Sequence, residues 1–311
     1  MSLESAAPRI VIVGAGAMGC LFAARLAEQG AQVTLVDVDR ARLAAIAAGG
    51  IALTDDQGSR TVPVGASLAA EVSGPVDLVL LFTKGLHSAA AIASVKHLAQ
   101  PDTLALTLQN GVGNAELLAE VFAPECVLMG TAHLPADLTG PAAVETHGFA
   151  YVTLGGFSSA AHNHADASAR LLTKAGFDAK IAEDISATVW DKLAFNAALN
   201  AVGMICEVPN AGVDNAHGRR IATKVVQETV AVATARGIAL DEAKILATVD
   251  SALREHAHHK ASMLQDREHG RRTEIDTITG AVAREGARLG VATPVCDTLT
   301  DLVRVIELAS A

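Results

Sequence analysis

The chain has 311 residues, of which 50% are hydrophobic and 19% are charged, and its formal net charge at pH 7 is −10. This composition is typical of a helix-rich globular enzyme with two domains, and the acidic balance argues against a nucleic-acid partner, which needs clustered Lys and Arg. No apolar run reaches the roughly 18 residues of a membrane span, and the first residues lack a secretory pattern, so we expect a cytoplasmic protein without a membrane partner.

The first half of the chain alternates strand and helix patterns. An apolar strand at 9–13 precedes a helix at 17–29, and the same pair recurs at 32–37 and 40–48. This alternation predicts an α/β fold with a doubly wound parallel sheet. Further strands are expected at 76–82, 103–108 and 126–133, helices at 86–98 and 114–122, an extended excursion at 51–64, and an antiparallel pair formed by 143–147 and 150–155.

Beyond about residue 182 the strand pattern fades and long amphipathic stretches follow. We therefore predict a doubly wound α/β domain at 1–182 and an all-α domain at 183–311. Helices are expected at 184–203, 217–236, 241–258, 274–289 and 295–309.

Three glycines, Gly14, Gly16 and Gly19, lie between the first strand and the first helix. The first allows a tight turn, the second lets a pyrophosphate approach the backbone, and the third lets the helix pack against the strand. Asp37 ends the second strand, where dinucleotide folds place a carboxylate on the adenosine ribose. A glycine-rich turn without a ligand is the alternative. The glycines and Asp37 predict that the domain at 1–182 is a dinucleotide-binding domain of Rossmann type. Its predicted cofactor-binding residues are Gly14, Ala15, Gly16, Ala17, Met18, Gly19 and Asp37.

A polar stripe is predicted on the first helix of the second half. Lys192, Asn196 and Asn200 are spaced four residues apart among Val, Leu, Phe and Ala, so a helix places them on one side. Polar groups in apolar surroundings need partners, which a ligand in a cleft would supply. A solvated helix face is the alternative, although asparagine is a poor interior helix former.

Two further groups follow strand ends or begin predicted helices. Asn110 lies in the turn Gln109-Asn110-Gly111 and Lys84 follows another strand, so both belong to the ligand-binding edge of a doubly wound sheet. Ser262 could be a helix cap, and Glu274 is expected to open the helix at 274–289. Taken alone, helix capping explains Ser262 and Glu274 as well as function does.

Neither the cysteines nor the histidines predict a metal site. Cys20, Cys126, Cys206 and Cys296 are scattered and are expected to be reduced packing residues. The cluster from His256 to His259 has no cysteine or carboxylate at a recognisable ligand spacing, so a solvated helix end is expected.

These motifs occur in the same order and spacing in the ketopantoate reductase (2-dehydropantoate 2-reductase) family, which the chain resembles over nearly its whole length. The resemblance rests on the glycine fingerprint, the turn at Asn110, the stripe at Lys192 and the block from Ser262 to Asp276. It implies a dinucleotide-binding domain and a helical domain with a cleft that holds the cofactor and a 2-oxo acid.

The resemblance also implies roles for individual residues. Lys192 is expected to be the general acid that protonates the carbonyl oxygen, and Glu274 is expected to support it. The substrate's polar groups are assigned to Asn196, Asn200 and Ser262. Asn110 is expected near both the nicotinamide and the substrate. Lys84, Asn110 and Glu274 are implied to lie at the cofactor.

The implied reaction is the NAD(P)H-dependent reduction of a branched 2-oxo acid, first of all ketopantoate to pantoate in pantothenate and coenzyme A biosynthesis. Asp37 stands where NADPH-dependent members carry an arginine, so we predict NADH to be preferred over NADPH, with Arg40 as the opposing charge. A D-2-hydroxy acid dehydrogenase acting on another 2-oxo acid and a non-catalytic dinucleotide sensor are the alternatives. A homodimer is expected.

Overall fold

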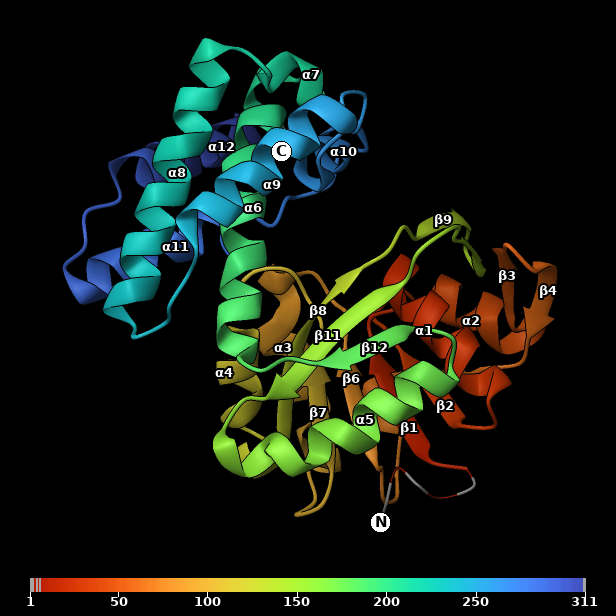
Figure 1. Cartoon of the computed structure of the whole chain (residues 1–311). Coiled ribbons are helices and arrows are strands. Elements are labelled where there is room, and N and C mark those ends of the chain that lie inside the picture. Colours follow the sequence, from red (N-terminus) through yellow and green to blue (C-terminus); the bar gives the residue numbers. More distant parts are fainter. Residues whose placement is uncertain (1–2, 4, 6, 310–311) are drawn as a thin grey trace. The chain divides into compact units, whose positions relative to one another are not determined.

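The structure, a computed structural model, describes residues 3, 5 and 7–309. By its internal contacts the chain divides into two compact units (Figure 1). Unit 1 comprises 1–109 and 114–185, and unit 2 comprises 110–113 and 186–311. A short turn from the first half of the sequence therefore belongs to the helical unit.

The described part of unit 1 contains a doubly wound sheet of eight strands in the order β12-β11-β8-β7-β6-β1-β2-β5. Every neighbouring pair is parallel except β8 with β11. The strands are β1 (Arg9–Val13), β2 (Gln32–Val36), β5 (Gly65–Ser67), β6 (Leu78–Leu81), β7 (Leu104–Thr107), β8 (Val127–His133), β11 (Tyr151–Gly156) and β12 (Asp178–Ile181).

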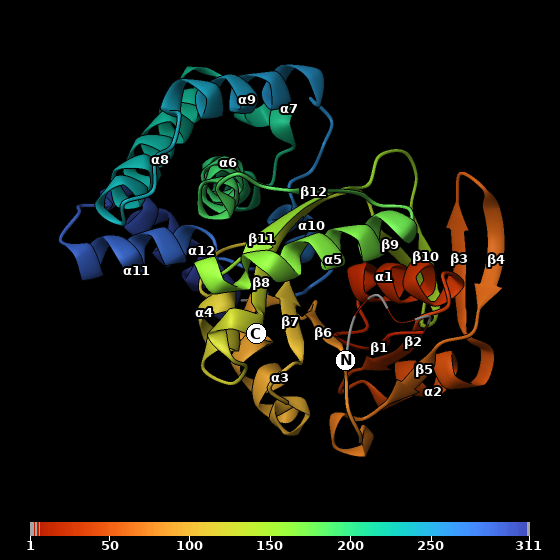
Figure 2. The same ribbon diagram turned by 60° about the horizontal axis from the view of Figure 1, so that its bottom comes forward.

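Helices cover both faces of this sheet, which explains why its central strands are apolar throughout. In β1, Ile10 and Ile12 join the core under α1 and α5, whereas Val11 and Val13 join the core under α3 and α4. Figure 2 shows α1 and α5 on one face and α3 on the other. The helices are α1 (Ala17–Glu28), α2 (Arg40–Gly49), α3 (Ser88–Ser94), α4 (Asn114–Ala119) and α5 (His162–Lys174).

The predicted antiparallel pair of 143–147 and 150–155 is wrong, because the two strands belong to different sheets. β10 joins a small sheet of order β4-β3-β10-β9, whereas β11 pairs with β8. The Asp56 carboxylate accepts a hydrogen bond from the Gly148 N–H (2.8 Å) and contacts His147 Nδ1 (2.8 Å), which ties the chain after β10 to the β3–β4 hairpin. The strands are β3 (Ile51–Asp55), β4 (Gly58–Val62), β9 (Asp137–Gly140) and β10 (Ala143–Glu145).

The helix predicted at 86–98 is interrupted. α3 spans only Ser88–Ser94, and it is flanked by single 3₁₀ turns η2 (Gly85–His87) and η3 (Lys96–Leu98). Val95 separates α3 from η3 with a φ of −108° and a ψ of 7°, and β-branched residues lose side-chain freedom in a helix. The remaining 3₁₀ turns are η1 (Ala69–Glu71), η4 (Pro124–Cys126) and η5 (Ser159–Ala161).

In unit 2 the helices pack around α6, which Figure 2 shows end on with α8 and α9 arching around it. The buried side of α6 is rich in alanine, including Ala194, Ala197 and Ala201, so neighbouring helices can approach closely. The helices are α6 (Ile185–Cys206), α7 (Asn210–Val213), α8 (Ala216–Ala235), α9 (Glu242–Glu255), α10 (Ser262–Glu268), α11 (Thr279–Leu289) and α12 (Pro294–Ala309).

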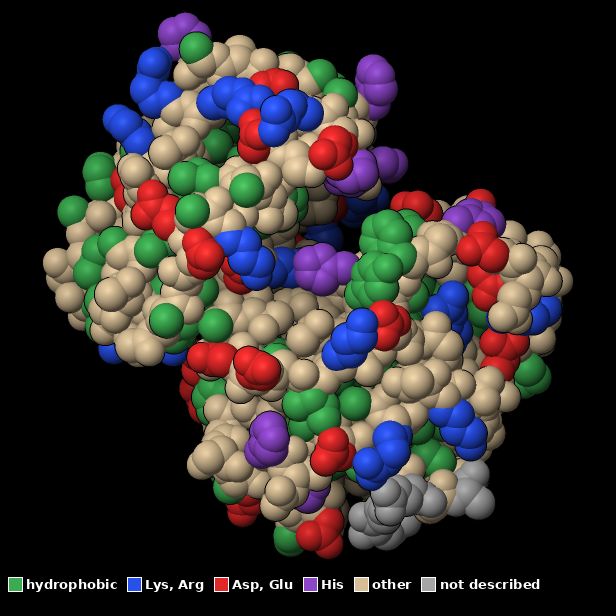
Figure 3. All heavy atoms as spheres, viewed as in Figure 1, with side chains coloured by type: hydrophobic (Ala, Val, Ile, Leu, Met, Phe, Trp, Pro, Cys, Tyr) green, Lys and Arg blue, Asp and Glu red, His purple; other side chains and the backbone are tan. Residues whose placement is uncertain are grey.

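Charged side chains are spread over the surface. On the face drawn in Figure 3, Lys and Arg side chains lie among Asp and Glu side chains. Of the helices that the structure describes, none has the length and apolar character to cross a membrane.

Candidate active site

The glycine turn has the geometry of a phosphate cradle. Gly14 has a φ of +108°, and a Cβ there would lie 2.7 Å from Thr83 N. A Cβ on Gly19 would lie 1.8 Å from the Gly14 carbonyl oxygen, so this glycine packs α1 against the turn. A Cβ on Gly16 would meet no atom within 4 Å, so the backbone there faces open space. Because α1 begins directly after Gly16, the turn fits the pyrophosphate of a dinucleotide.

Asp37 follows β2 and is held by backbone N–H groups. Its Oδ2 accepts a hydrogen bond from Ala15 N (2.6 Å), and its Oδ1 accepts from Val38 N (2.7 Å) and Asp39 N (3.0 Å). The sequence predicted a ribose contact for this carboxylate. The structure adds a structural role for Asp37, because the same carboxylate fixes the glycine turn by accepting from Ala15 N.

A polar network lies at the carboxyl ends of β6 and β7. Gln109 Nε2 donates to the Thr83 carbonyl oxygen and to Ser88 Oγ (3.0 Å), and Ser88 Oγ donates to Asn114 Oδ1 (2.8 Å). Lys84 lies at the same edge and precedes η2. Sequence reasoning gave no role to Ser88 or Asn114, although polar residues near the end of an apolar strand could have indicated one.

The turn Asn110–Gly113 is docked on the segment that carries Glu274. Asn110 Nδ2 donates to Glu274 Oε2 (3.3 Å), and Val112 N donates to the Thr277 carbonyl oxygen (3.2 Å). Gly111 has a φ of +86°, and a Cβ there would lie 2.1 Å from the Thr277 carbonyl oxygen. Only glycine therefore fits at this position.

Glu274 does not open a helix, contrary to the prediction. α11 begins at Thr279, and the Glu274 carbonyl oxygen accepts bonds from Thr277 N (3.1 Å) and Ile278 N (3.0 Å) within an irregular turn. The Thr277 carbonyl is occupied by Val112 N, and Ile278 has a non-helical ψ of −99°. These two features explain why the helix starts five residues later than the apolar pattern suggests.

The predicted stripe lies on α6. Asn200 is buried, and its Oδ1 accepts from Ser262 Oγ (3.2 Å) and Met263 N (3.4 Å). Ser262 is exposed and is the first residue of α10, whose N-cap is Ala261, so the cap interpretation of Ser262 is wrong. Asn196 is half-buried, and within the described residues its amide shows no hydrogen bond, which leaves it able to bind a ligand.

Lys192 has an altered acidity. Burial lowers the pKa of its ammonium from 10.5 to about 8, and the charge of Glu274 opposes this by raising the pKa. An amine with a pKa near the working pH can both donate and accept a proton, which is the property of a general acid or base.

Several other residues are not assigned to the candidate site. Trp190 is buried, and the Arg236 guanidinium lies 5.6 Å from the centre of its ring, which suits a packing role. His256, His258 and His259 are exposed beyond α9. Among the residues that the structure describes, no group of three or more His, Cys, Asp or Glu side chains is placed to hold a metal.

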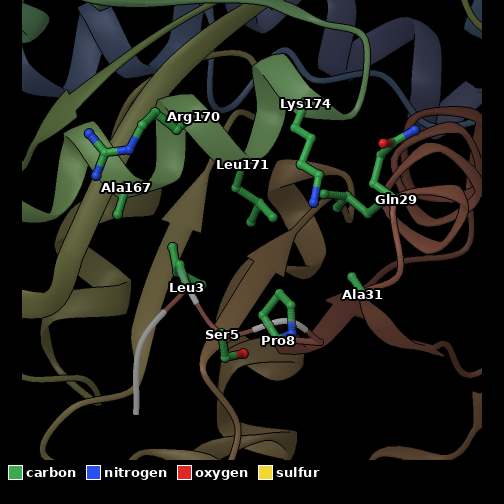
Figure 4. A pocket seen from close by; sticks show the side chains of 10 residues that line it. Leu3, Ser5, Pro8, Gln29, Ala31, Ala167, Arg170, Leu171 and Lys174 are labelled. Carbon is green, nitrogen blue, oxygen red and sulfur yellow. The ribbon is translucent and has the colours of Figure 1, made fainter.

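A cavity of about 170 Å³ lies in unit 1 between α5, the end of α1 and the segment before β1 (Figure 4). Pro8 and Ala31, which line it, precede β1 and β2. The cavity therefore lies at the amino end of the sheet, whereas the glycine turn and Asp37 lie at the carboxyl end.

A Rossmann-type unit with an intact phosphate turn, together with a helical unit in which the charge of a glutamate acts on a half-buried lysine, defines the chain as an NAD(P)-dependent oxidoreductase. Two family models match it, "Ketopantoate reductase PanE/ApbA" over residues 10–159 and "Ketopantoate reductase PanE/ApbA C terminal" over residues 184–307. The chain belongs to the ketopantoate reductase family.

Relatives of known name agree with this assignment. The chain is 31% identical to the 2-dehydropantoate 2-reductase of Streptococcus pyogenes serotype M18, covering 96% of this chain and 97% of that one. The enzyme of the same name from Lactococcus lactis is also 31% identical, over 96% of this chain and 98% of its own length.

Solved structures extend the similarity to a second activity. The 2-dehydropantoate 2-reductase of Geobacter metallireducens superposes with a TM-score of 0.88 at 31% identity, over 96% of this chain and 99% of that one. A D-mandelate dehydrogenase with NADH and anilino(oxo)acetate superposes with a TM-score of 0.92 at 30% identity, over 97% of this chain and 99% of that one.

Proposed function

We propose that the chain reduces the keto group of a branched 2-oxo acid and that 2-dehydropantoate, which becomes pantoate, is its substrate. The proposal rests above all on Lys192, a half-buried lysine on α6 whose pKa is lowered to about 8 by burial and is raised by the charge of Glu274. The names of the relatives support the choice of substrate. This reaction would place the enzyme in pantothenate and coenzyme A biosynthesis.

In this proposal Lys192 protonates the carbonyl oxygen as negative charge develops on it. The bound reduced nicotinamide supplies the hydride. Glu274 keeps the amine protonated and oriented, and Asn110 Nδ2 donates a hydrogen bond to the Glu274 carboxylate. Asn196, Asn200 and Ser262 bind the hydroxyl, carbonyl and carboxylate groups of the substrate, because an amide and a hydroxyl can each donate to an oxygen.

We further propose that NADH is preferred over NADPH. The cofactor would be held by the glycine turn, Asp37 and Lys84, with Asn110 and Glu274 near the nicotinamide. The negative charge of Asp37 would repel a 2′-phosphate and attract ribose hydroxyls. Arg40, the opposing charge three residues after Asp37, is exposed at the start of α2. Arg42 is the next cation along the chain, and its Nε lies 3.6 Å from the Asp39 carboxylate.

A second candidate is a D-2-hydroxy acid dehydrogenase that acts on an aromatic 2-oxo acid. The observation that favours it is the similarity to the D-mandelate dehydrogenase, whose NADH agrees with the cofactor expected from Asp37. The proposed roles of Lys192 and Glu274 are the same for both candidates, because both reactions reduce the keto group of a 2-oxo acid.

The deciding experiment is a steady-state assay of ketopantoate and benzoylformate, each with NADH and with NADPH. We expect the highest kcat/KM for ketopantoate with NADH. Turnover of benzoylformate without turnover of ketopantoate would instead establish the second candidate. Failure to reduce any 2-oxo acid, with cofactor binding retained, would favour the non-catalytic sensor.

Three broader expectations remain predictions. A homodimer is supported by Leu302, Val305 and Leu308, which are 45%, 62% and 79% exposed on α12 and could pack against a second copy. Light scattering at micromolar concentration would test this. The cytoplasmic location and the domain bounds at 1–182 and 183–311 are likewise kept as proposals.

A further inference from the structure

The segment that carries Glu274, residues 271–278, is fastened to the C-terminal helix α12. One oxygen of Glu307, Oε1, accepts hydrogen bonds from both Thr273 N and Thr273 Oγ1, each at 2.7 Å. Thr273 is 4% exposed and the Glu307 side chain 11% exposed. Two donors of the residue directly before Glu274 therefore depend on one largely buried carboxylate.

A second link lies on the other side of Glu274. Arg304 on α12 donates to Asp276 Oδ1 through Nε (3.1 Å) and Nη2 (2.7 Å). The two side chains are 48% and 39% exposed, so solvent weakens this pair. Glu307 is the stronger of the two links, because the donors of Thr273 have no access to water if the carboxylate is removed.

The backbone around Glu274 is held by the hydrogen bonds of an irregular turn before α11, not by a continuous helix. The Glu274 carbonyl oxygen accepts from Thr277 N and Ile278 N, and the Thr277 carbonyl oxygen accepts from Val112 N. Ile275 and Ile278 anchor the turn in the apolar core, but apolar contacts are not directional. The polar contacts that help to orient the Glu274 side chain include that of Asn110 on the carboxylate and those of Glu307 on the preceding residue.

We propose that Glu307 is a positioning residue for the reaction, which holds the Glu274 carboxylate where its charge keeps the Lys192 amine protonated and oriented. This inference rests on the roles of Lys192 and Glu274 in the proposed function. Loss of Glu307 leaves two buried donors of Thr273 unpaired, so the segment shifts to find water and carries Glu274 with it. Misplacement by about 1 Å can lower a rate about 100-fold.

The chain offers a conservative variant and a matched control. Glu307→Gln keeps an acceptor oxygen for Thr273 and removes only the charge. Glu228 on α8 also accepts two hydrogen bonds, at the N-terminal end of α12. Its two oxygens accept from Val295 N (2.9 Å) and Cys296 N (2.8 Å). Glu228→Ala therefore removes a comparable pair of hydrogen bonds without touching the segment 271–278.

The experiment compares the wild type with Glu307→Ala, Glu307→Gln and Glu228→Ala. One readout is kcat against pH, and the other is the pKa of Lys192, measured by NMR of lysine-labelled protein without substrate and assigned with Lys192→Arg. For Glu307→Ala we expect kcat to fall about 10- to 100-fold with a smaller change in KM. We also expect the pKa of Lys192 to drop, because the charge that raises it has moved away. Glu307→Gln and Glu228→Ala should keep both properties.

Three results would overturn the proposal. The first is a Glu307→Ala protein whose Lys192 pKa and pH profile match those of Glu228→Ala, because the role would then be structural only. The second is an equal effect of Glu307→Gln, because charge rather than position would then be responsible. If Glu307→Ala does not fold, Thr273→Val removes the hydroxyl that donates to Glu307 (2.7 Å) and accepts from Ile275 N (3.3 Å). This variant should shift both readouts in the same direction, and no shift would be the third result. The NMR readout needs no turnover, so a wrong substrate assignment cannot be mistaken for a failure of this inference.

Discussion

Asn110 donates a hydrogen bond to the carboxylate of Glu274 across 164 positions of sequence. Asn110 lies between β7 and α4 in the chain, yet its turn belongs to unit 2. The candidate catalytic residues Lys192 and Glu274 and the candidate substrate-binding residues are thus all members of the helical unit. The candidate phosphate turn and Asp37 are members of the other.

Gly111→Ala should damage activity far more than Gly113→Ala. Both glycines have positive φ values, +86° and +101°, so either change costs about 1–3 kcal/mol of backbone strain. Only at Gly111 would the new Cβ also meet an atom, the Thr277 carbonyl oxygen at 2.1 Å, whereas nothing lies within 4 Å at Gly113. We expect kcat to fall at least about tenfold for Gly111→Ala alone. Equal losses in steady-state assays would contradict the docking of this turn.

Lys192→Ala should abolish most turnover while the protein still binds its cofactor. Loss of a general acid lowers kcat by about 10²–10⁴-fold. Lys244→Ala is the control, because Lys244 is an exposed lysine of the same unit that pairs with Asp191 at 3.5 Å. Cofactor binding is followed by fluorescence titration. Retention of more than about a tenth of the wild-type kcat would remove Lys192 from the proposed mechanism.

The rates of 2-oxo acid reduction and of hydroxy acid oxidation should change with pH in opposite directions. Reduction needs the protonated form of Lys192, whose pKa is lowered to about 8, so kcat/KM for the 2-oxo acid should decline above that pH. Oxidation of the hydroxy acid needs the neutral amine and should rise through the same range. Initial rates from about pH 6 to about pH 10 test this, and a flat profile across the range would exclude Lys192 as the titrating group.

Lys192→Met should stabilise the protein at neutral pH. Burial lowers the pKa of Lys192 from 10.5 in the unfolded chain to about 8 in the folded one, so the folded state binds fewer protons between these values. Stability from this group therefore rises with pH across that window and is lowest below pH 8. Methionine removes the penalty, and we expect a gain on the order of 1–3 kcal/mol at pH 7 in urea unfolding. The gain should shrink towards pH 10; a variant less stable than the wild type at pH 7 would show that the charge is well compensated.

Asp37→Ala should weaken cofactor binding, because the carboxylate holds the glycine turn through Ala15 N at 2.6 Å. We expect KM for NADH to rise about tenfold, in line with the loss of one charge-assisted hydrogen bond. Asp39→Ala is the comparison, since Asp39 caps α2 by accepting from Arg42 N (3.0 Å), so its loss weakens the start of that helix. If both variants raise KM equally, the turn does not depend on Asp37. A wild-type preference for NADPH would refute the assignment of this carboxylate to NADH.

The parallel sheet could be predicted because strands covered on both faces form apolar runs, as Leu78–Leu81 does. Helix α5 was missed because its buried face consists of small residues, Ala165, Ser168 and Ala169, with a single Leu172. The helix is nevertheless amphipathic, so its 3.6-residue periodicity could have revealed it. Strand β12 was missed because it is a short edge strand with alternating polar residues.

The α6 stripe could be predicted because a spacing of four residues fixes a helix face. The surroundings of Glu274 could not be, because they depend on contacts that are remote in sequence. The Thr277 carbonyl binds Val112, and Thr273 binds Glu307. No local pattern signals either contact, and together they turn an expected helix start into an irregular turn.

Because residues 110–113 belong to unit 2, the polypeptide passes between the units three times. A fragment beginning at residue 186 would lack the N–H that occupies the Thr277 carbonyl and the amide that binds Glu274. Chimeras that exchange helical units between relatives must therefore also exchange residues 110–113. Without them, the exchanged unit would lack its own partners for the Thr277 carbonyl and the Glu274 carboxylate.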